Sequence, residues 1–362
     1  MSMNDMVMTV IAAFIVLGAL DKALGNRMGL GSAFTEGMMS MGTLALVMVG
    51  IVSLAPTLAG LLIPVISPLY EAIGADPASF ANTILAVDMG GYALASQMAQ
   101  SAEAGLFSWV FLGTMLGPTI VFTIPVALGL VERKDHPYFA KGVLIGISTI
   151  PVGCLVGGIV AGIQMEIILR NLIIPVILSV FIMLALYLYT DLTVKVFKYF
   201  GSGITLISLI GLVAVGVETL TGWVIIPGMA PLSEGITIVG TIAIVLAGAF
   251  PMVAVINKTC QKPLARAGRM LHLDAPTTAG LIASLAHNIP TFRLVKDMNP
   301  RGKVISIAFA VSGSFVLGGH LGFVAGMDKT MVTAMIIGKL SGGISAALVA
   351  AWTSTSDSKM NQ

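Results

Sequence analysis

Charged residues are scarce in this 362-residue sequence: only 10% of the residues are Asp, Glu, Lys or Arg, whereas 57% are hydrophobic. Soluble domains contain roughly 25% charged residues, so this chain has too few charges to cover a water-exposed surface. The 19 Lys and Arg residues against 17 Asp and Glu give a net charge of only +2, and they form no basic cluster that would suggest nucleic acid. The composition therefore excludes a soluble enzyme and indicates a protein that is largely surrounded by lipid.

The residues and motifs of common enzyme and metal chemistry are also missing. The two cysteines, Cys154 in an apolar run and Cys260 in a basic loop, are too few for a disulfide framework or a thiolate metal site. The sequence contains no GxxxxGKS/T phosphate loop, no HExxH zinc motif and no GxSxG elbow. We therefore expect no enzyme activity, no ATP-driven pumping, no cofactor and no metal.

Long apolar runs predict many membrane-crossing helices, since a helix needs about 20 mainly apolar residues to cross the hydrocarbon. Such runs lie at 6–24, 37–56, 106–130, 141–165, 168–190, 203–225, 236–256, 304–326 and 330–352. The stretch 57–74 is also apolar, and the sequence leaves open whether it enters the membrane. We expect an all-α polytopic membrane protein with about 9–11 transmembrane helices.

Two further apolar runs, 79–98 and 277–292, are interrupted by polar residues and helix breakers. The interruptions consist of Asp88, Gly90 and Gly91 in the first run and of His287, Asn288 and Pro290 in the second. Irregular backbone at membrane depth is tolerated only where it is buried in protein or lines a cavity. Both runs therefore predict interrupted or re-entrant helices beside a polar site.

The interrupted runs occupy equivalent positions in an internal repeat with an offset of about 198 residues. Segment 34–46 (FTEGMMSMGTLAL) aligns with 232–244 (LSEGITIVGTIAI), and segment 76–88 aligns with 274–287. We predict one transmembrane domain over residues 1–362. It consists of repeat 1 at about 6–165, a linking helix at about 168–190 and repeat 2 at about 203–352.

The basic residues favour an inverted orientation of the two repeats, because short cytoplasmic loops accumulate Lys and Arg. If both interrupted runs dip into the membrane and return, with the N-terminus outside, all but three of the 19 basic residues fall on the inner side. The exceptions are Arg170 and Lys329 outside and Lys339 within a span. Inverted repeats with interrupted helices indicate a secondary transporter whose substrate binds near the membrane midplane.

Asp88 is the first candidate substrate-binding residue. A carboxylate inside an apolar segment is costly, so by default it marks a functional site or a buried partner. Its charge predicts a cationic substrate. The alternative is that Asp88 caps the half-helix that begins near Gly90, or pairs with Lys339.

Four neighbours of Asp88 in the same run are further candidates. Tyr92 lies one helical turn on and offers a π face to an ammonium group. Asn82, Ser96 and Gln97 supply amide and hydroxyl partners. The alternative for Tyr92 is an interfacial or packing role, and for the other three a hydrogen bond between helices.

In the second repeat, His287, Asn288 and Thr291 occupy the corresponding interruption. An Asn with a Thr suits a substrate hydroxyl, and a lone imidazole can relay protons near neutral pH. Packing is the alternative for His287. We expect His320 to be structural, and the recurring Glu36 and Glu234 to complement the helix dipole as N-terminal caps.

The string LAVDMGGYALA (85–95), the interruption AHNIPTF (286–292), the length and the span pattern resemble the bacterial ethanolamine utilisation membrane protein family, the ethanolamine permeases. The likeness covers essentially the whole chain, and the VDMGGY string is moderately specific. The resemblance implies uptake of ethanolamine across the bacterial cytoplasmic (inner) membrane. It implies no assignment of ligand-binding residues.

The candidate residues suit ethanolamine. By analogy with the lysine amine its pKa is around 10, so it is overwhelmingly a cation near neutral pH and only the rare neutral form crosses lipid unaided. Asp88 with Tyr92 would hold the ammonium group, and Asn288 with Thr291 the hydroxyl. We expect a facilitator or secondary carrier, and the residues leave open whether a proton or sodium ion is coupled.

Two other functions were weighed against transport. A proton or cation channel needs a ring of repeated acidic residues or a carbonyl filter, whereas the equivalents Asp88 and His287 differ in chemistry. An integral membrane enzyme needs a nucleophile with a base, or a metal cluster, and the spans offer neither. The glycine-rich helix faces are compatible with a homodimer, and the oligomeric state stays open.

Overall fold

The computed structural model describes residues 2–270 and 273–360, and in these residues it contains helices and no strand. Eight of the described helices are long and apolar enough to cross a membrane. They are Met3–Ala23, Leu30–Glu71, Ala102–Leu130, Arg133–Val160, Met165–Leu188, Leu192–Thr221, Leu232–Thr259 and Lys329–Ser354. The predicted all-α polytopic fold is confirmed.

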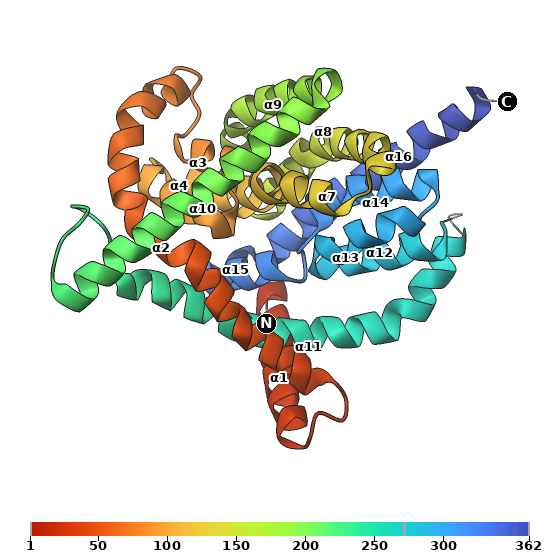
Figure 1. Cartoon of the computed structure of the whole chain (residues 1–362), viewed down its shortest axis with the longest axis horizontal. Helices are drawn as coiled ribbons and strands as arrows, with labels where there is room; N and C mark the ends of the chain where they lie inside the picture. Colours follow the sequence, from red (N-terminus) through yellow and green to blue (C-terminus); the bar gives the residue numbers. More distant parts are fainter. Residues whose placement is uncertain (1, 271–272, 361–362) are drawn as a thin grey trace.

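Long helices form the frame of the molecule (Figure 1). They are α1 (Met3–Ala23), α2 (Leu30–Glu71), α8 (His136–Val160), α9 (Met165–Leu188), α10 (Thr190–Thr221), α11 (Leu232–Met270) and α16 (Val332–Met360). The most extensive contacts join α2 with α11 and α8 with α16. Glycine permits the second of these pairings, because a Cβ atom on Gly338 would lie 2.9 Å from the carbonyl oxygen of Gly153.

Shorter helical segments fill the interior of this frame. In the first half they are α3 (Ala78–Ile84), η1 (Val87–Gly91), α4 (Tyr92–Met98), α5 (Ala102–Phe107), η2 (Ser108–Leu112), α6 (Gly113–Pro118), η3 (Thr119–Thr123), α7 (Ile124–Leu130) and η4 (Arg133–Asp135). In the second half they are α12 (Ala275–Ala286), α13 (Asn288–Leu294), η5 (Val295–Asp297), α14 (Pro300–Gly313), α15 (Gly319–Met327) and η6 (Lys329–Met331).

The predicted continuous span at 304–326 is wrong, because the chain breaks between α14 and α15. The backbone N–H groups of Phe315 and Leu317 donate to the carbonyl oxygens of Ser284 (3.0 Å) and Leu285 (2.8 Å). These two carbonyls lie at the end of α12, where His287 stops the helix and leaves them without helical partners. One interruption therefore requires the other.

The stretch 57–74, which the sequence left open, is for the most part a continuation of α2. The helix runs unbroken from Leu30 to Glu71, although Pro56, Pro64 and Pro68 lie inside it. With 304–326 divided, and with the runs 79–98 and 277–292 also divided, the described residues contain eight candidate spans instead of 9–11.

The first interrupted run is a hairpin whose two ends meet. The carboxylate of Asp76, just before α3, accepts hydrogen bonds from the backbone N–H groups of Gln100 and Ser101, just after α4, at 3.0 Å each. Asn171 of α9 holds the same end by accepting from the N–H of Asp76 (2.9 Å) and the hydroxyl of Ser79 (2.7 Å). The chain thus enters and leaves at one place, as a re-entrant segment does.

The second interrupted run is closed in the same way, 198 residues later. Asp274, before α12, accepts a hydrogen bond from the N–H of Asn299, after α13, at 2.6 Å. Asp274 also caps α12 through the N–H of Thr277 (2.9 Å), and Asn299 caps α14 through the N–H of Gly302 (2.7 Å). We call residues 76–101 the first hairpin and residues 274–299 the second hairpin.

The two hairpins enter from opposite ends of α8. At the start of α8, Asp135 binds Lys303, which lies one helical turn beyond the second hairpin. Past the other end of α8, the N–H of Gln164 donates to Glu103, two residues beyond the first hairpin. The 25-residue helix α8 is about 37 Å long. The mouths of the hairpins, where each hairpin begins and ends, therefore lie far apart, and their tips, the interruptions in the middle of each hairpin, point inward. A full inverted repeat stays a prediction.

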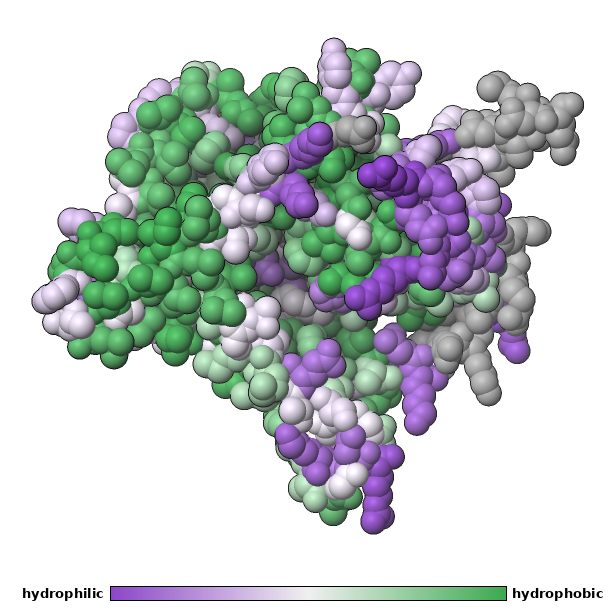
Figure 2. Space-filling view, viewed as in Figure 1, coloured by the Kyte–Doolittle hydropathy of each residue, from purple (hydrophilic) through white to green (hydrophobic). Residues whose placement is uncertain are grey.

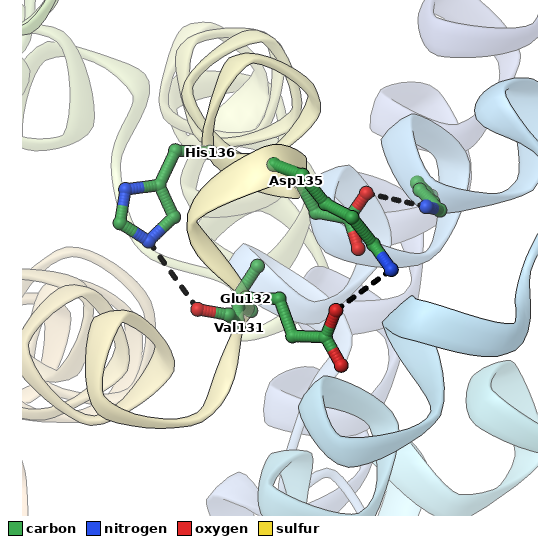
Figure 3. Close-up of polar contacts among 6 residues, drawn as sticks. Val131, Glu132, Asp135 and His136 are labelled. Carbon is green, nitrogen blue, oxygen red and sulfur yellow. Dashed lines mark hydrogen bonds and ion pairs between the residues drawn. The ribbon is translucent and has the colours of Figure 1, made fainter.

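The turn at residues 131–136 fixes α8 against α14 (Figure 3). The ammonium group of Lys303 lies 2.5 Å from the carboxylate of Asp135, and both side chains are buried. Glu132 and Lys134 form a second ion pair at 2.8 Å, but both are exposed. Exposed pairs contribute little to stability, whereas loss of one partner of a buried pair is strongly destabilising.

The outer surface separates into apolar and polar regions. Figure 2 shows a broad hydrophobic area over α2, α9 and α10, and hydrophilic side chains gathered near α12, α14 and the turn before α8. On α9 alone the exposed side chains include Ile177, Phe181, Leu184 and Tyr187. Exposed apolar area of this extent is typical of a surface that contacts lipid.

Replacing Asp76 with alanine should destabilise the protein, because the N–H groups of Gln100 and Ser101 at the mouth of the first hairpin would lose a charged acceptor. We expect the free energy of unfolding to fall by roughly 3 kcal/mol, measured by denaturant unfolding in detergent micelles. Glu71→Ala is the matched control, since exposed Glu71 accepts from the Gln100 side chain at the same mouth. Equal losses of unfolding free energy in the two variants would contradict the role of Asp76 in closing the first hairpin.

Candidate functional site

A cavity of about 820 Å³ lies where the interruptions of the chain come together. Ala86, Asp88 and Met89 of the first hairpin line it, and so do Ala286 and His287 of the second hairpin and Phe315, Gly319 and His320 around the break before α15. Its remaining walls come from α2, α10, α11 and the segment from the end of α6 to α7. Three separate interruptions of helical backbone therefore share one cavity.

Glycines allow other backbone segments to approach both hairpin tips. A Cβ atom on Gly117 would overlap the carbonyl oxygen of Leu85, where α3 ends. A Cβ atom on Gly318 would likewise overlap the carbonyl oxygen of Ala286, where α12 ends. In each half the chain after the hairpin thus packs against its tip without a side chain between them.

Asp88 reaches the cavity because the first hairpin changes direction just before it. Leu85 and Ala86 are extended, and Gly90 takes a left-handed φ of +94° that favours glycine. The Asp88 side chain is half-buried and lines the cavity. Among the described residues no side chain donates a hydrogen bond to it or forms an ion pair with it.

The two alternative roles weighed for Asp88 are not observed. Lys339 directs its ammonium group to the carbonyl oxygen of Thr114 at 2.5 Å and forms no ion pair with Asp88 within 4.0 Å. The half-helix α4 begins after Gly91 without a side-chain cap. Asp88 is therefore a carboxylate that faces the cavity with no side-chain partner in the described chain.

His287 has both a structural contact and a place in the cavity wall. Its backbone is extended, and its Nδ1 accepts the N–H of Ile289 at 3.2 Å, so it caps α13. The ring lies edge-on to Phe315 (4.7 Å between centroids) and Phe122 (6.0 Å). Half-buried and lining the cavity, it faces the same space as Asp88.

Three predicted residues hold the interruptions in shape and do not line the cavity. Buried Asn82 donates to the carbonyl oxygen of Gly91 (3.1 Å) and to Ser108 (3.0 Å), which fixes the first tip. Buried Asn288 donates to Thr123 at 3.2 Å, and buried Thr291 donates to the carbonyl oxygen of Gly280 at 2.7 Å.

The other predicted residues of the first hairpin lie away from the cavity. Tyr92 is half-buried in an aromatic cluster, 5.3 Å from Trp109 and 5.4 Å from Phe323 between ring centroids. Ser96 is exposed and donates to the carbonyl oxygen of Tyr92 at 2.8 Å, and Gln97 is also exposed. The cavity thus brings together Asp88 and His287 of the eight candidates.

Several cavity residues were missed from the sequence. His320, expected to be structural, lines the cavity although it is 3% exposed, and its Nδ1 has no partner within the described chain. Glu36 also lines the cavity. Its expected capping role is wrong because it lies in the second turn of α2, whereas Glu234 does lie in the first turn of α11.

The cavity has apolar as well as polar walls. Phe122, Phe250 and Phe315 face it together with hydroxyl groups of α2 and α10, and Lys198 is a basic lining residue. Phe315 is one of two non-glycine residues with positive φ (+63°) in the described chain, a conformation that surrounding contacts must hold in place. The run of glycines at 313, 318 and 319 was the signal in the sequence that this segment breaks.

Comparison with known proteins gives matches over the whole chain. The family model described as "Ethanolamine utilisation protein, EutH" matches residues 3–353. An uncharacterized protein of Bacillus subtilis, YxeR, is 60% identical over 100% of this chain and 98% of its own length. Proteins named "Probable ethanolamine permease EutH" are 51% identical in Listeria monocytogenes (100% of this chain, 97% of that protein) and 42% in Salmonella typhimurium (97% and 95%). No solved structure matches.

The cavity boundary is testable by cysteine labelling in a background that lacks Cys154 and Cys260. A cysteine at Ser202, which lines the cavity and is exposed, should react with a small charged methanethiosulfonate, because thiolates form only where water reaches. A cysteine at Thr291, which is fully buried, should react at least tenfold more slowly. Equal rates would place Thr291 in the cavity after all.

Proposed function

The chain belongs to the ethanolamine utilisation protein EutH family, and from this premise we propose that it carries ethanolamine across the bacterial cytoplasmic membrane as the protonated cation. The multi-pass membrane fold and the relatives named as probable ethanolamine permeases support transport. The protonated form and the carrier mechanism are our proposals. We propose no chemical conversion of the substrate.

The observation that carries the proposal is the placement of Asp88. Its carboxylate faces the cavity at the tip of a re-entrant hairpin and has no side-chain partner in the described chain. A charge in surroundings of low dielectric constant is stabilised by an opposite charge at close range. A small ammonium ion supplies that charge, whereas an anionic substrate would be repelled.

The substrate hydroxyl has several partners near Asp88. Asn288 already donates to Thr123 of η3, and Thr291 donates to Gly280 inside the second hairpin, so we assign both to positioning its tip. Thr43 of α2 faces the cavity and can donate or accept a hydrogen bond. Ser40, whose hydroxyl donates to the carbonyl oxygen of Gly37, can still accept, and His287, whose Nδ1 accepts from Ile289, can donate from Nε2. We propose that these groups, together with Asp88, select a short amino alcohol.

The size of the cavity implies a hydrated path with weak binding. Its volume of about 820 Å³ is typical of sites for ligands much larger than four-atom ethanolamine, so water fills most of it. A ceiling of about 1.5 kcal/mol per non-hydrogen atom limits ethanolamine to about 6 kcal/mol, or a Kd no tighter than roughly 40 μM. Binding is therefore best measured with millimolar ligand.

Opposed hairpins suit a carrier that opens to one side at a time. Each tip forms part of the wall around Asp88 and His287, and each mouth lies at a different end of α8. Movement of one hairpin would open the cavity toward one side while the other hairpin keeps it closed. The alternative is a cation channel, for which uptake would not saturate and unitary currents would appear.

Uptake of radiolabelled ethanolamine into proteoliposomes tests the proposal. At an external pH of about 6 only about one molecule in ten thousand is neutral, so leakage is small. We expect saturable uptake that falls at least tenfold in Asp88→Asn, because removing one partner of a buried charge pair costs roughly 2–5 kcal/mol.

Glu166→Gln is the matched control. It removes one carboxylate charge from an exposed pair with Arg170 on α9, outside the cavity, and should transport as the unchanged protein does. Full uptake by Asp88→Asn would remove Asp88 from the site. Absence of saturation together with unitary currents would replace the carrier by a channel, and product formation from ethanolamine would indicate an enzyme.

A further inference from the structure

Lys339 is the buried charge that the proposed function leaves unused. Lys339 is 1% exposed in α16, and within the described chain its ammonium group has one hydrogen-bond acceptor, the carbonyl oxygen of Thr114 at 2.5 Å. It follows Gly338 directly, where α16 packs backbone to backbone against Gly153 and Gly157 of α8. The lysine is therefore held in a tightly packed part of the membrane domain.

The titratable groups that face Lys339 come from three neighbouring elements. Electrostatic interactions join it to Asp88 in the first hairpin, to Cys154 on α8 and to His320 at the start of α15. His320 interacts in turn with His287 in the second hairpin. Within the described chain, Asp88 is the one carboxylate among these groups.

A buried ammonium group with a single neutral acceptor is costly unless an anion lies close to it. Asp88 supplies that anion, at a distance beyond direct contact, as long as no substrate cation is bound to it. A cationic substrate that binds Asp88 would leave Lys339 as an uncompensated charge. Lysine, unlike arginine, can resolve this conflict by giving up its proton.

Building on the proposed function, we propose that Lys339 is the resident counter-cation of Asp88 and releases a proton when an ammonium substrate binds. The proton passes from Nζ of Lys339 to the cavity water, and His320 is the group placed to relay it. His320 lines the cavity, interacts electrostatically with Lys339 and has an Nδ1 without a partner in the described chain.

The charges balance in this exchange. The substrate brings one positive charge to Asp88, Lys339 loses one, and the net charge of the site stays the same. One substrate cation is therefore exchanged for one proton. Raising the pH favours binding, because it removes the proton that competes for Asp88, while ethanolamine itself stays charged until about pH 9. The apparent Kd should fall by up to tenfold per pH unit while Lys339 titrates, and then become constant.

Calorimetric titration of the purified full-length protein with millimolar ethanolamine counts the protons. Heats measured at one pH in phosphate and in Tris, which differ in ionisation enthalpy, give the number released per ligand bound. We expect close to one proton at a pH where Lys339 is charged. Binding without proton release from pH 6 to pH 9 overturns the exchange and leaves the proposed function intact. Absence of binding overturns both.

Two variants at position 339 separate the lysine from other proton sources. Lys339→Met should bind ethanolamine without proton release and with a Kd that no longer changes over this pH range. Lys339→Arg keeps a permanent charge beside Asp88, so its Kd should weaken at least tenfold and it too should release no proton. The control is Lys134→Met, which removes an exposed lysine at the turn before α8 and should behave as the unchanged protein does.

Proton release that persists in Lys339→Met overturns the assignment, because the proton would then come from the ligand or another group. If Lys339→Met does not fold, Lys339→Arg decides together with the proton count on the unchanged protein, because release that persists in Lys339→Arg also overturns the assignment. His320→Gln tests the relay separately. It should slow uptake while leaving the number of protons released at equilibrium unchanged, and an unchanged uptake rate would remove His320 from the path.

Discussion

The requirement that buried backbone groups find hydrogen-bond partners governs this structure. Every interruption of a helix at membrane depth leaves carbonyl and N–H groups that lipid cannot satisfy. The end of α12 is satisfied by the N–H groups of Phe315 and Leu317, and the first tip by the amide of Asn82. The interruptions therefore occur together, and their meeting place is the cavity that exposes Asp88.

The sequence was informative where an interruption carries a charge or a proline, as at Asp88 and at His287 to Pro290, because such residues are conspicuous in an apolar run. It also revealed the equivalence of the two hairpins through the matched segments that begin at Asp76 and Asp274. The break at 314–318 was missed because Ser, Phe, Val and Leu look like an ordinary span. The break arises from pairing with a distant segment, and the flanking Gly313, Gly318 and Gly319 were its one local sign in the sequence.

The sequence predicted the cavity residues that lie at the interruptions of the two hairpins, but not the direction in which their neighbours point. Asp88 and His287 lie in the cavity because each is placed where a helix has stopped: His287 directly follows the end of α12, and Asp88 lies four residues beyond the end of α3. Asn82, Asn288 and Thr291 are equally polar and close in sequence, but their side chains donate to the carbonyl oxygen of Gly91, the hydroxyl of Thr123 and the carbonyl oxygen of Gly280. Glu36 and His320 reach the cavity from other helices, and only tertiary packing brings them there. The direction in which a side chain points is set by contacts that a single sequence does not show.

The length of α2 and α11 has a mechanical consequence. At the helical rise of about 1.5 Å per residue, their 42 and 39 residues correspond to about 63 and 58 Å, roughly twice the hydrocarbon thickness of about 30 Å. They cross each other obliquely and bend (Figure 1), and a bilayer accommodates such excess length by tilt or by local deformation. Because both helices also form walls of the cavity, lipid acyl-chain length acts on the shape of that cavity, and the thickness of the host membrane becomes a physical variable of the binding site.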